Sequence, residues 1–188
     1  MEMVPLTALW APVVLSAILV FVVSSIIHMV LPYHRSDYGC LPAEDDVMDA
    51  LRRFKLPPGD YLVPCAGTPD RMRSPEFHEK MKRGPVLMVT VMEPGPPTFG
   101  KQLVAWFVYS IVVGVFAGYV TGRALGPGAQ YMNVFRFVGT VAFTGYALAL
   151  WQQTIWYKKS PSATLKSTFD GLVYALLTAG AFGWLWPR

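Results

Sequence analysis

The chain has 188 residues, of which 53% are hydrophobic and only 15% are charged, with a formal net charge of +4. This composition excludes a disordered chain and an ordinary cytosolic domain. Ten of the 16 Lys and Arg residues and ten of the 12 Asp and Glu residues fall between Pro32 and Gln102, so the other segments are strongly apolar. Because this charged segment has no net charge, no basic stripe is left for nucleic acid. The sequence therefore predicts a membrane protein.

The first span is predicted at about residues 6–31. This run of 26 residues has His28 as its only titratable side chain, and a bilayer core needs only about 20 residues of helix. A cleaved signal peptide is disfavoured, because no Lys or Arg precedes the run and the run exceeds the usual length of about 7–15 apolar residues. We expect the segment to stay as a membrane anchor.

Residues 32–102 are too long for a plain connection and contain signals of their own. Pro42, followed by three acidic residues, predicts a helix start, and Ser74-Pro75-Glu76 predicts a second helix that ends at Gly84. The β-rich runs 61–63 and 86–92 are expected to pair as two strands. The segment is therefore predicted to form a small α/β cap against the membrane face.

Three further spans follow, at about residues 103–121, 134–157 and 168–186. The last is short, and we expect Ser167 or Thr168 to cap its helix, with Asp170 in the first turn where a carboxylate favours the positive end of the helix dipole. The predicted fold class is an all-α membrane protein, with four transmembrane helices and a cap of about 70 residues between helices one and two.

The positive-inside rule predicts the orientation. Near the span ends, the side of the long loop carries five Lys and Arg residues and the opposite side carries three; they are Arg35, Lys101, Lys158, Lys159 and Lys166, against Arg123, Arg136 and Arg188. We therefore expect a cytoplasmic loop at 32–102, with both termini outside. Whether Cys40 and Cys65 ever form a disulfide is left open by the sequence.

Three stretches resemble a family of small uncharacterised bacterial four-helix integral membrane proteins. That family is defined by a domain of unknown function. The three stretches are SSIIHMVLPYHRSDY at 24–38, the glycine-rich stretch at 114–128 and the closing stretch at 168–188. The resemblance implies a multi-pass protein of the bacterial inner membrane. It implies no catalytic residue, substrate or cofactor.

Small residues recur every four positions on two of the spans. They are Gly114, Gly118 and Gly122 on the second span, and Gly171, Ala175, Ala179 and Gly183 on the fourth. Such a ridge lines one helix face and lets two backbones approach closely. One interpretation is a homodimer through one ridge. The favoured interpretation is that spans two and four pack against each other, because two ridges in one chain can satisfy each other.

Four polar residues are expected at similar depth at the loop end of the spans: His28, Gln152, Gln153 and Asp170. We interpret them as interfacial groups that act independently of one another. The alternative is a His–carboxylate pair that relays a proton or holds a metal. The spacing of His28, His34 and Cys40 matches no usual ligand pattern, and Pro32 keeps the two histidines from sharing a helical face. The sequence thus predicts neither a metal site nor a cofactor.

The sequence has no Gly-rich phosphate loop, no G-x-S-x-G and no H-E-x-x-H. It favours a non-enzymatic structural or accessory component of the bacterial inner membrane, which offers its cytoplasmic cap as a docking surface. The alternatives are a small oligomeric transporter or channel, and an interfacial membrane enzyme that uses His28 and Asp170. The expected partners are the lipid bilayer and either further copies of the chain or a larger membrane complex, with no nucleic acid.

Overall fold

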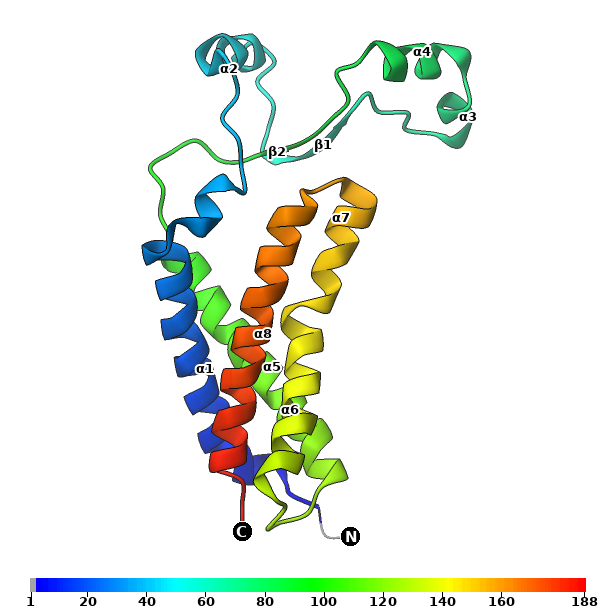
Figure 1. The fold of residues 1–188 in the computed structure, drawn as a ribbon. Coiled ribbons are helices and arrows are strands. Elements are labelled where there is room, and N and C mark those ends of the chain that lie inside the picture. The colour runs from blue at the N-terminus through cyan, green and yellow to red at the C-terminus, as the bar shows by residue number, and fades with distance from the viewer. Residues whose placement is uncertain (1–2) are drawn as a thin grey trace. The chain divides into compact units, whose positions relative to one another are not determined.

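The computed structural model describes residues 3–188, and the chain forms two units (Figure 1). The helical unit comprises the chain up to Gly39 and from Thr98 onward, and the inserted unit comprises Cys40–Pro97. Residues 32–39, which belong to the segment expected to form the cap, are thus part of the helical unit. This assignment matters because several polar side chains of that stretch contact the long helices.

The helical unit is built from long helices that run beside one another (Figure 1). Helix α1 packs against α5 and α8, and α6 packs against the same two helices. The bounds are η1 (Leu6–Leu9), α1 (Trp10–Ser25), the π-helical turn η2 (Ile26–Val30), η3 (Pro32–Ser36), α5 (Gly100–Ala124), α6 (Tyr131–Tyr146), η4 (Leu148–Leu150), α7 (Trp151–Tyr157) and α8 (Pro161–Trp184).

Within residues 3–188, three helical segments are long and apolar enough to cross a membrane: Leu6–Val30, Gly100–Ala124 and Tyr131–Tyr157. Their outward faces carry large apolar side chains such as Val104 and Phe116, which are exposed. Contiguous apolar surface of this kind is rare on soluble proteins but is what a lipid environment requires. These features fit a multi-pass membrane protein. Helix α8 is long enough to span, but it is less apolar than these three segments.

Both described ends of the chain lie at the connection between α5 and α6 (Figure 1). The Val4 amide donates to the Gly122 carbonyl at 3.0 Å, and the Gly128 amide donates to the Pro187 carbonyl at 2.8 Å. The Trp186 indole N–H also donates to the Gly126 carbonyl, at 3.0 Å. Helix α8 therefore runs from the α7 end of the unit to the end that holds the α5–α6 connection.

Helix α8 begins seven residues before the expected start, so the prediction of a Ser167 or Thr168 cap is wrong. Ser160 is the N-cap, its hydroxyl accepts from the Ala163 amide, and Pro161 follows at the first helical position. A Ser–Pro pair is a strong start signal, because proline has no N–H to satisfy. Thr168 lies inside the helix and donates to the Thr164 carbonyl. Asp170 is consequently not in the first turn.

The inserted unit contains α2 (Glu44–Arg52), β1 (Gly59–Val63), α3 (Pro69–Met72), α4 (Pro75–Arg83) and β2 (Leu87–Val91). The predicted strand pairing is confirmed: β1 and β2 are antiparallel, with Gly59 opposite Val91. The Ser74 hydroxyl caps α4 by accepting from the Phe77 amide, and Gly84 ends the helix with a φ of 59°. The short helix α3 was not predicted.

Candidate functional site

The polar side chains of the helical unit gather where η2, η3 and α8 meet. Helix α1 ends in the π turn η2, Leu31 is extended, and Pro32 then starts η3. This reversal brings the His34 ring back onto the end of the first span, with its centroid 4.5 Å from that of His28. The cluster lies within one unit of the structure.

Asp170 is at the centre of the cluster and is only 2% exposed. The Tyr33 hydroxyl donates to its Oδ1 atom, and His34 Nε2 lies 2.8 Å from its Oδ2 atom. Both oxygens of this carboxylate therefore have a partner, as a buried charge requires. Partial burial, and then the hydrogen bond to Asp170, raises the pKa of the Tyr33 hydroxyl well above its ordinary value.

Lys166 fastens η3 to α8, one turn before Asp170 on the same helix. Its ammonium group donates to the Asp37 carboxylate and the Ser36 hydroxyl, both at 2.8 Å, and to the Tyr33 carbonyl at 2.6 Å. Asp37 Oδ2 lies 2.6 Å from His34 Nδ1. The hydrogen bond from Lys166, followed by that from His34, holds the pKa of the Asp37 carboxyl below its ordinary value.

His34 therefore lies between two carboxylates, one at each ring nitrogen. Ionised carboxylates only accept hydrogen bonds, so satisfying both contacts within the protein requires an N–H on each nitrogen. In that state the ring is an imidazolium, and the charges of His34 and Lys166 balance those of Asp37 and Asp170. The cluster is then neutral as a whole, which lowers the cost of burying it.

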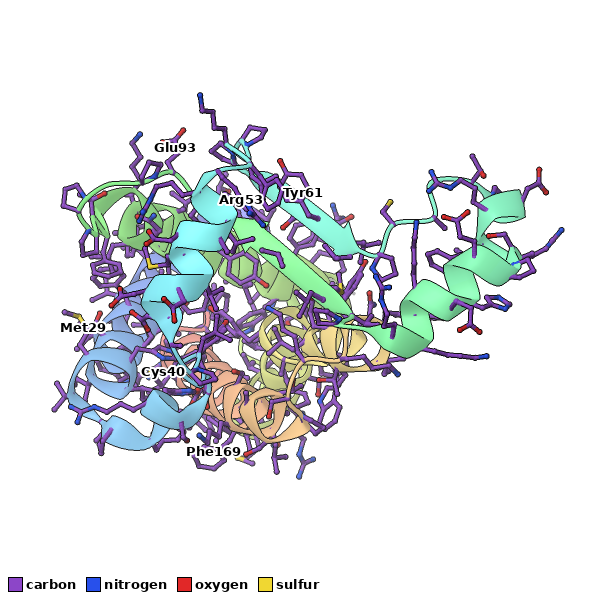
Figure 2. All side chains as sticks on the ribbon, turned by 90° about the horizontal axis from the view of Figure 1, so that it is seen from above. Met29, Cys40, Arg53, Tyr61, Glu93 and Phe169 are labelled. Carbon is purple, nitrogen blue, oxygen red and sulfur yellow. The ribbon has the colours of Figure 1, made fainter. Side chains whose placement is uncertain are left out.

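His28 is the outer member of the cluster. Its Nε2 atom lies 3.4 Å from the Tyr174 hydroxyl. One ligand atom each from His28, His34 and Asp170 lies within 4.8 Å of the others. Next to these residues, Met29 and Phe169 are 76% and 62% exposed (Figure 2). The polar groups are thus flanked by apolar side chains on the outer surface of the helical unit.

A cavity of about 480 Å³ borders the cluster between α1 and α5. His28 and Gln102 are among its polar lining residues, and Trp106 and Met29 are among its apolar ones. The Trp106 indole N–H donates to the Ser24 hydroxyl at 2.8 Å and so holds the cavity wall in place. His28 belongs to both the cavity and the cluster, so a molecule in the cavity can contact this member of the cluster.

The structure brings together two of the four polar residues proposed from the sequence. His28 and Asp170 meet, whereas Gln152 and Gln153 are exposed on α7 and make none of the hydrogen bonds described for the cluster. The reason is local: α6 ends at Tyr146, and the turn η4 separates it from α7. The expectation for the glutamines depended on depth alone, and similar depth does not bring side chains of different helices together.

Sequence reasoning did not include Tyr33, His34, Asp37 and Lys166 in the cluster. In the sequence, His34 is separated from His28 by Pro32, which excludes a shared helical face, and Lys166 indicates only the orientation of the spans. The available signal was the density of polar side chains directly after Pro32, with His34 and Asp37 three residues apart, as a helical turn requires. A 3₁₀ turn started by that proline points both side chains back toward the helices.

The small-residue ridges do not pack mainly against each other. A Cβ atom at Gly114 would meet Val13 and Ser16 of α1, and one at Gly122 would lie 2.6 Å from the Val4 carbonyl oxygen. On α8, a Cβ atom at Gly171 would lie 2.8 Å from the Ala147 Cβ atom. Gly183 faces Tyr131 of α6, and Ala179 lies against Gly139 of the same helix. Ala175 is buried. In the α5 ridge only Gly118 faces α8, where it lies against Phe182.

The expectation that spans two and four pack through these ridges is therefore corrected. Because α1 and α6 each pack against both α5 and α8, the two ridge-bearing helices lie diagonally across the unit. Each ridge closes mainly on a different neighbour, α1 for α5 and α6 for α8. Both ridges are occupied within a single chain.

No family model matches the chain, and no curated protein or solved structure matches it either. No residue role can therefore be transferred to the cluster from a relative. The interpretation of the cluster depends on its own geometry and charge.

Proposed function

We propose that the chain is a four-span protein of the bacterial inner membrane, whose inserted unit forms a cytoplasmic cap and binds a partner protein. In this role it is an accessory component of a membrane complex and not an enzyme. The observation that carries the proposal is the exposure of the apolar side chains of the inserted unit.

The proposal takes α8 as the fourth span. The hydrogen bonds from Gly128 to Pro187 and from Trp186 to Gly126 support this assignment, because they hold the end of α8 at the connection between two membrane-spanning segments. The polar residues that lower its apolarity, Lys166 and Asp170, have partners inside the protein. A helix whose polar groups are paired internally is compatible with a lipid environment.

The inserted unit buries very little apolar surface. Among its residues only Ala66 is buried, and on or next to α2 the side chains of Met48, Leu51 and Phe54 are 54%, 46% and 59% exposed. Most residues of β1, marked by Tyr61 in Figure 2, and of β2 are exposed as well. A two-stranded sheet is at best marginally stable in water. Covering these side chains with a partner would supply the missing apolar contacts.

The charge of the inserted unit favours a protein over a lipid surface as that partner. The unit carries eight Lys and Arg residues against nine Asp and Glu residues. Binding to anionic headgroups needs a clear excess of basic residues, which the unit lacks. The apolar side chains instead suit a protein surface that is itself apolar at its centre.

Site-specific photo-crosslinking in native membranes tests the proposal. A photoreactive amino acid replaces Met48 on α2 or Met88 on β2, and as a control it replaces the exposed Glu79 or Lys82 on α4. We expect the two apolar positions to give a discrete product heavier than the 20.9 kDa chain, and the control positions to give little. Mass spectrometry then identifies the attached protein.

Three results would contradict the proposal. Crosslinks without an increase in mass would mean that the chain covers its own inserted unit. A product of twice the chain mass would mean that a second copy binds there. Equal products at apolar and control positions would mean that crosslinking is not specific.

A further inference from the structure

The convergence of His28, His34 and Asp170 has a chemical meaning beyond docking. Two imidazoles and one carboxylate come from three different segments, η2, η3 and α8, and one ligand atom from each lies within 4.8 Å of the others. We propose that these three residues bind a divalent transition-metal ion of the zinc class. Metal binding at this place is independent of the partner-binding role of the inserted unit.

The distances suit such an ion. Ligands at about 2.0–2.2 Å from a tetrahedral zinc ion lie about 3.3–3.6 Å from one another. The present 2.8 Å separation between His34 Nε2 and Asp170 Oδ2 would widen slightly, and His28 would approach. Because His28 is exposed at the end of the first span, its side chain has room for this movement.

The neighbouring groups form the second shell that metal-binding histidines require. A ligating histidine usually donates its other N–H to a carboxylate, which orients the ring. Asp37 is at that position, with its Oδ2 atom 2.6 Å from His34 Nδ1, and Lys166 donates to its other oxygen, Oδ1. Tyr33 donates to Oδ1 of Asp170 and leaves Oδ2 for the ion.

A bound ion would also change how the charge of Asp170 is balanced next to His34. In the ion-free protein, the contact between His34 Nε2 and Asp170 needs a proton on that nitrogen. A divalent cation takes the place of this proton and pairs with the buried Asp170 carboxylate. Asp37 then accepts from the remaining N–H of His34 and stays paired with Lys166.

The ligand set indicates the type of site. Nitrogen and oxygen ligands without a thiolate suit zinc and related divalent ions. Three protein ligands leave a coordination position open, which is typical of catalytic sites and not of structural ones. His28 also lines the cavity between α1 and α5, so this position is accessible to a small molecule.

Zinc binding to the full chain tests the proposal. The protein is purified in mild detergent through a tag that contains no histidine, with Cys40 and Cys65 replaced by serine, because free thiols also bind zinc. After treatment with a chelator, zinc is titrated by calorimetry, and native mass spectrometry gives the stoichiometry. We expect one zinc ion per chain, and a visible absorption spectrum of four-coordinate cobalt when Co²⁺ is used as the probe.

Variants locate the ion. His28→Gln is the main variant, because His28 is exposed and its loss leaves the contacts among His34, Asp37 and Asp170 in place. We expect it, and Asp170→Asn, to weaken zinc binding by more than Asp37→Asn, for which the loss of a second-shell partner predicts about 10–100-fold. His78→Gln, on the exposed helix α4, is the matched control and should bind zinc like the unchanged protein.

Two results would overturn the proposal. The first is that the unchanged protein binds no zinc under conditions in which it is folded. The second is that His28→Gln and His78→Gln bind zinc equally well. Either result would mean that the cluster is a network of hydrogen bonds and ion pairs that connects η3 to α8 without a metal.

Discussion

Asp170 shows how one residue couples the two parts of the chain that form the cluster. Its carboxylate lies on α8, but its partners Tyr33 and His34 follow the first span, more than 130 residues away in sequence. A buried carboxylate of this kind is costly when a partner is removed, because the remaining group stays in a medium of low dielectric constant. The cluster therefore acts as one unit, unlike a set of independent interfacial groups.

A double-mutant cycle measures this coupling. Asp170→Asn and His34→Gln are each expected to lower the free energy of unfolding by about 2–3 kcal/mol. Each substitution leaves the other residue of the pair buried without the opposite charge that it contacts. The double variant should cost little more than either single one. Unfolding in mixed micelles, with a chelator present so that no ion contributes, provides the measurement. Additive effects, within about 0.5 kcal/mol, would mean that the two residues act independently.

At this scale the sequence identified part of the cluster. His28 and Asp170 stand out because each is a titratable group within a predicted span, His28 in 6–31 and Asp170 in 168–186. The approach of His34 could not be read from spacing, since it depends on the π turn η2, the extended Leu31 and the 3₁₀ turn that follows. The proline and the polar residues after it indicate a turn, but they do not indicate that this turn packs its side chains against α8.

At the scale of elements, the small residues of α8 determine how closely it approaches α6. A Cβ atom at Gly171 would lie 2.8 Å from the Ala147 Cβ atom and 3.3 Å from the backbone of Tyr146. At Gly180, on the same helix, the nearest atom would be the Tyr131 hydroxyl oxygen at 3.8 Å. The two glycines thus differ in packing although both are helical.

Gly171→Ala and Gly180→Ala form a matched pair. We expect Gly171→Ala to destabilise the protein by about 1–3 kcal/mol, because a backbone neighbour cannot move aside as a flexible side chain can. Gly180→Ala should be neutral or stabilising by up to about 1 kcal/mol, since alanine is the better helix former. Thermal unfolding in detergent compares the two variants. Equal stability of both would show that α8 does not pack closely on α6.

Elements with strong local signals were predicted well. Helix α4 begins after Ser74 and ends before Gly84, as expected. The N-cap hydroxyl that starts a helix and the residue with positive φ that ends it depend only on the neighbouring sequence. The sequence predicts the start of α8 too late, because Ser167 and Thr168 are also possible caps and Lys166 is expected in the connection before the span. The structure shows that a lysine inside a helix can be satisfied by Asp37 and by backbone of another segment. Charge alone therefore does not delimit a membrane helix.

For the whole molecule, the same lysine weakens the argument for orientation. Five basic residues near the span ends were counted on the side of the long loop, but Lys166 is paired with Asp37 inside the helical unit. The remaining bias is four to three, which is small. The number of spans and their direction are separate questions, and each needs its own reporter position.

Cysteine labelling in intact cells answers both questions. Cys40 and Cys65 are free and exposed in the inserted unit, and Arg188→Cys, in a chain without other cysteines, reports on the exposed end that follows α8. Four spans with a cytoplasmic inserted unit predict that Cys65 reacts only with a membrane-permeant maleimide, whereas Arg188→Cys also reacts with an impermeant one. The reverse pattern would keep four spans but invert the orientation. The same accessibility at both positions would mean that α8 does not cross the membrane, because only two spans, an even number, would then separate Cys65 from residue 188.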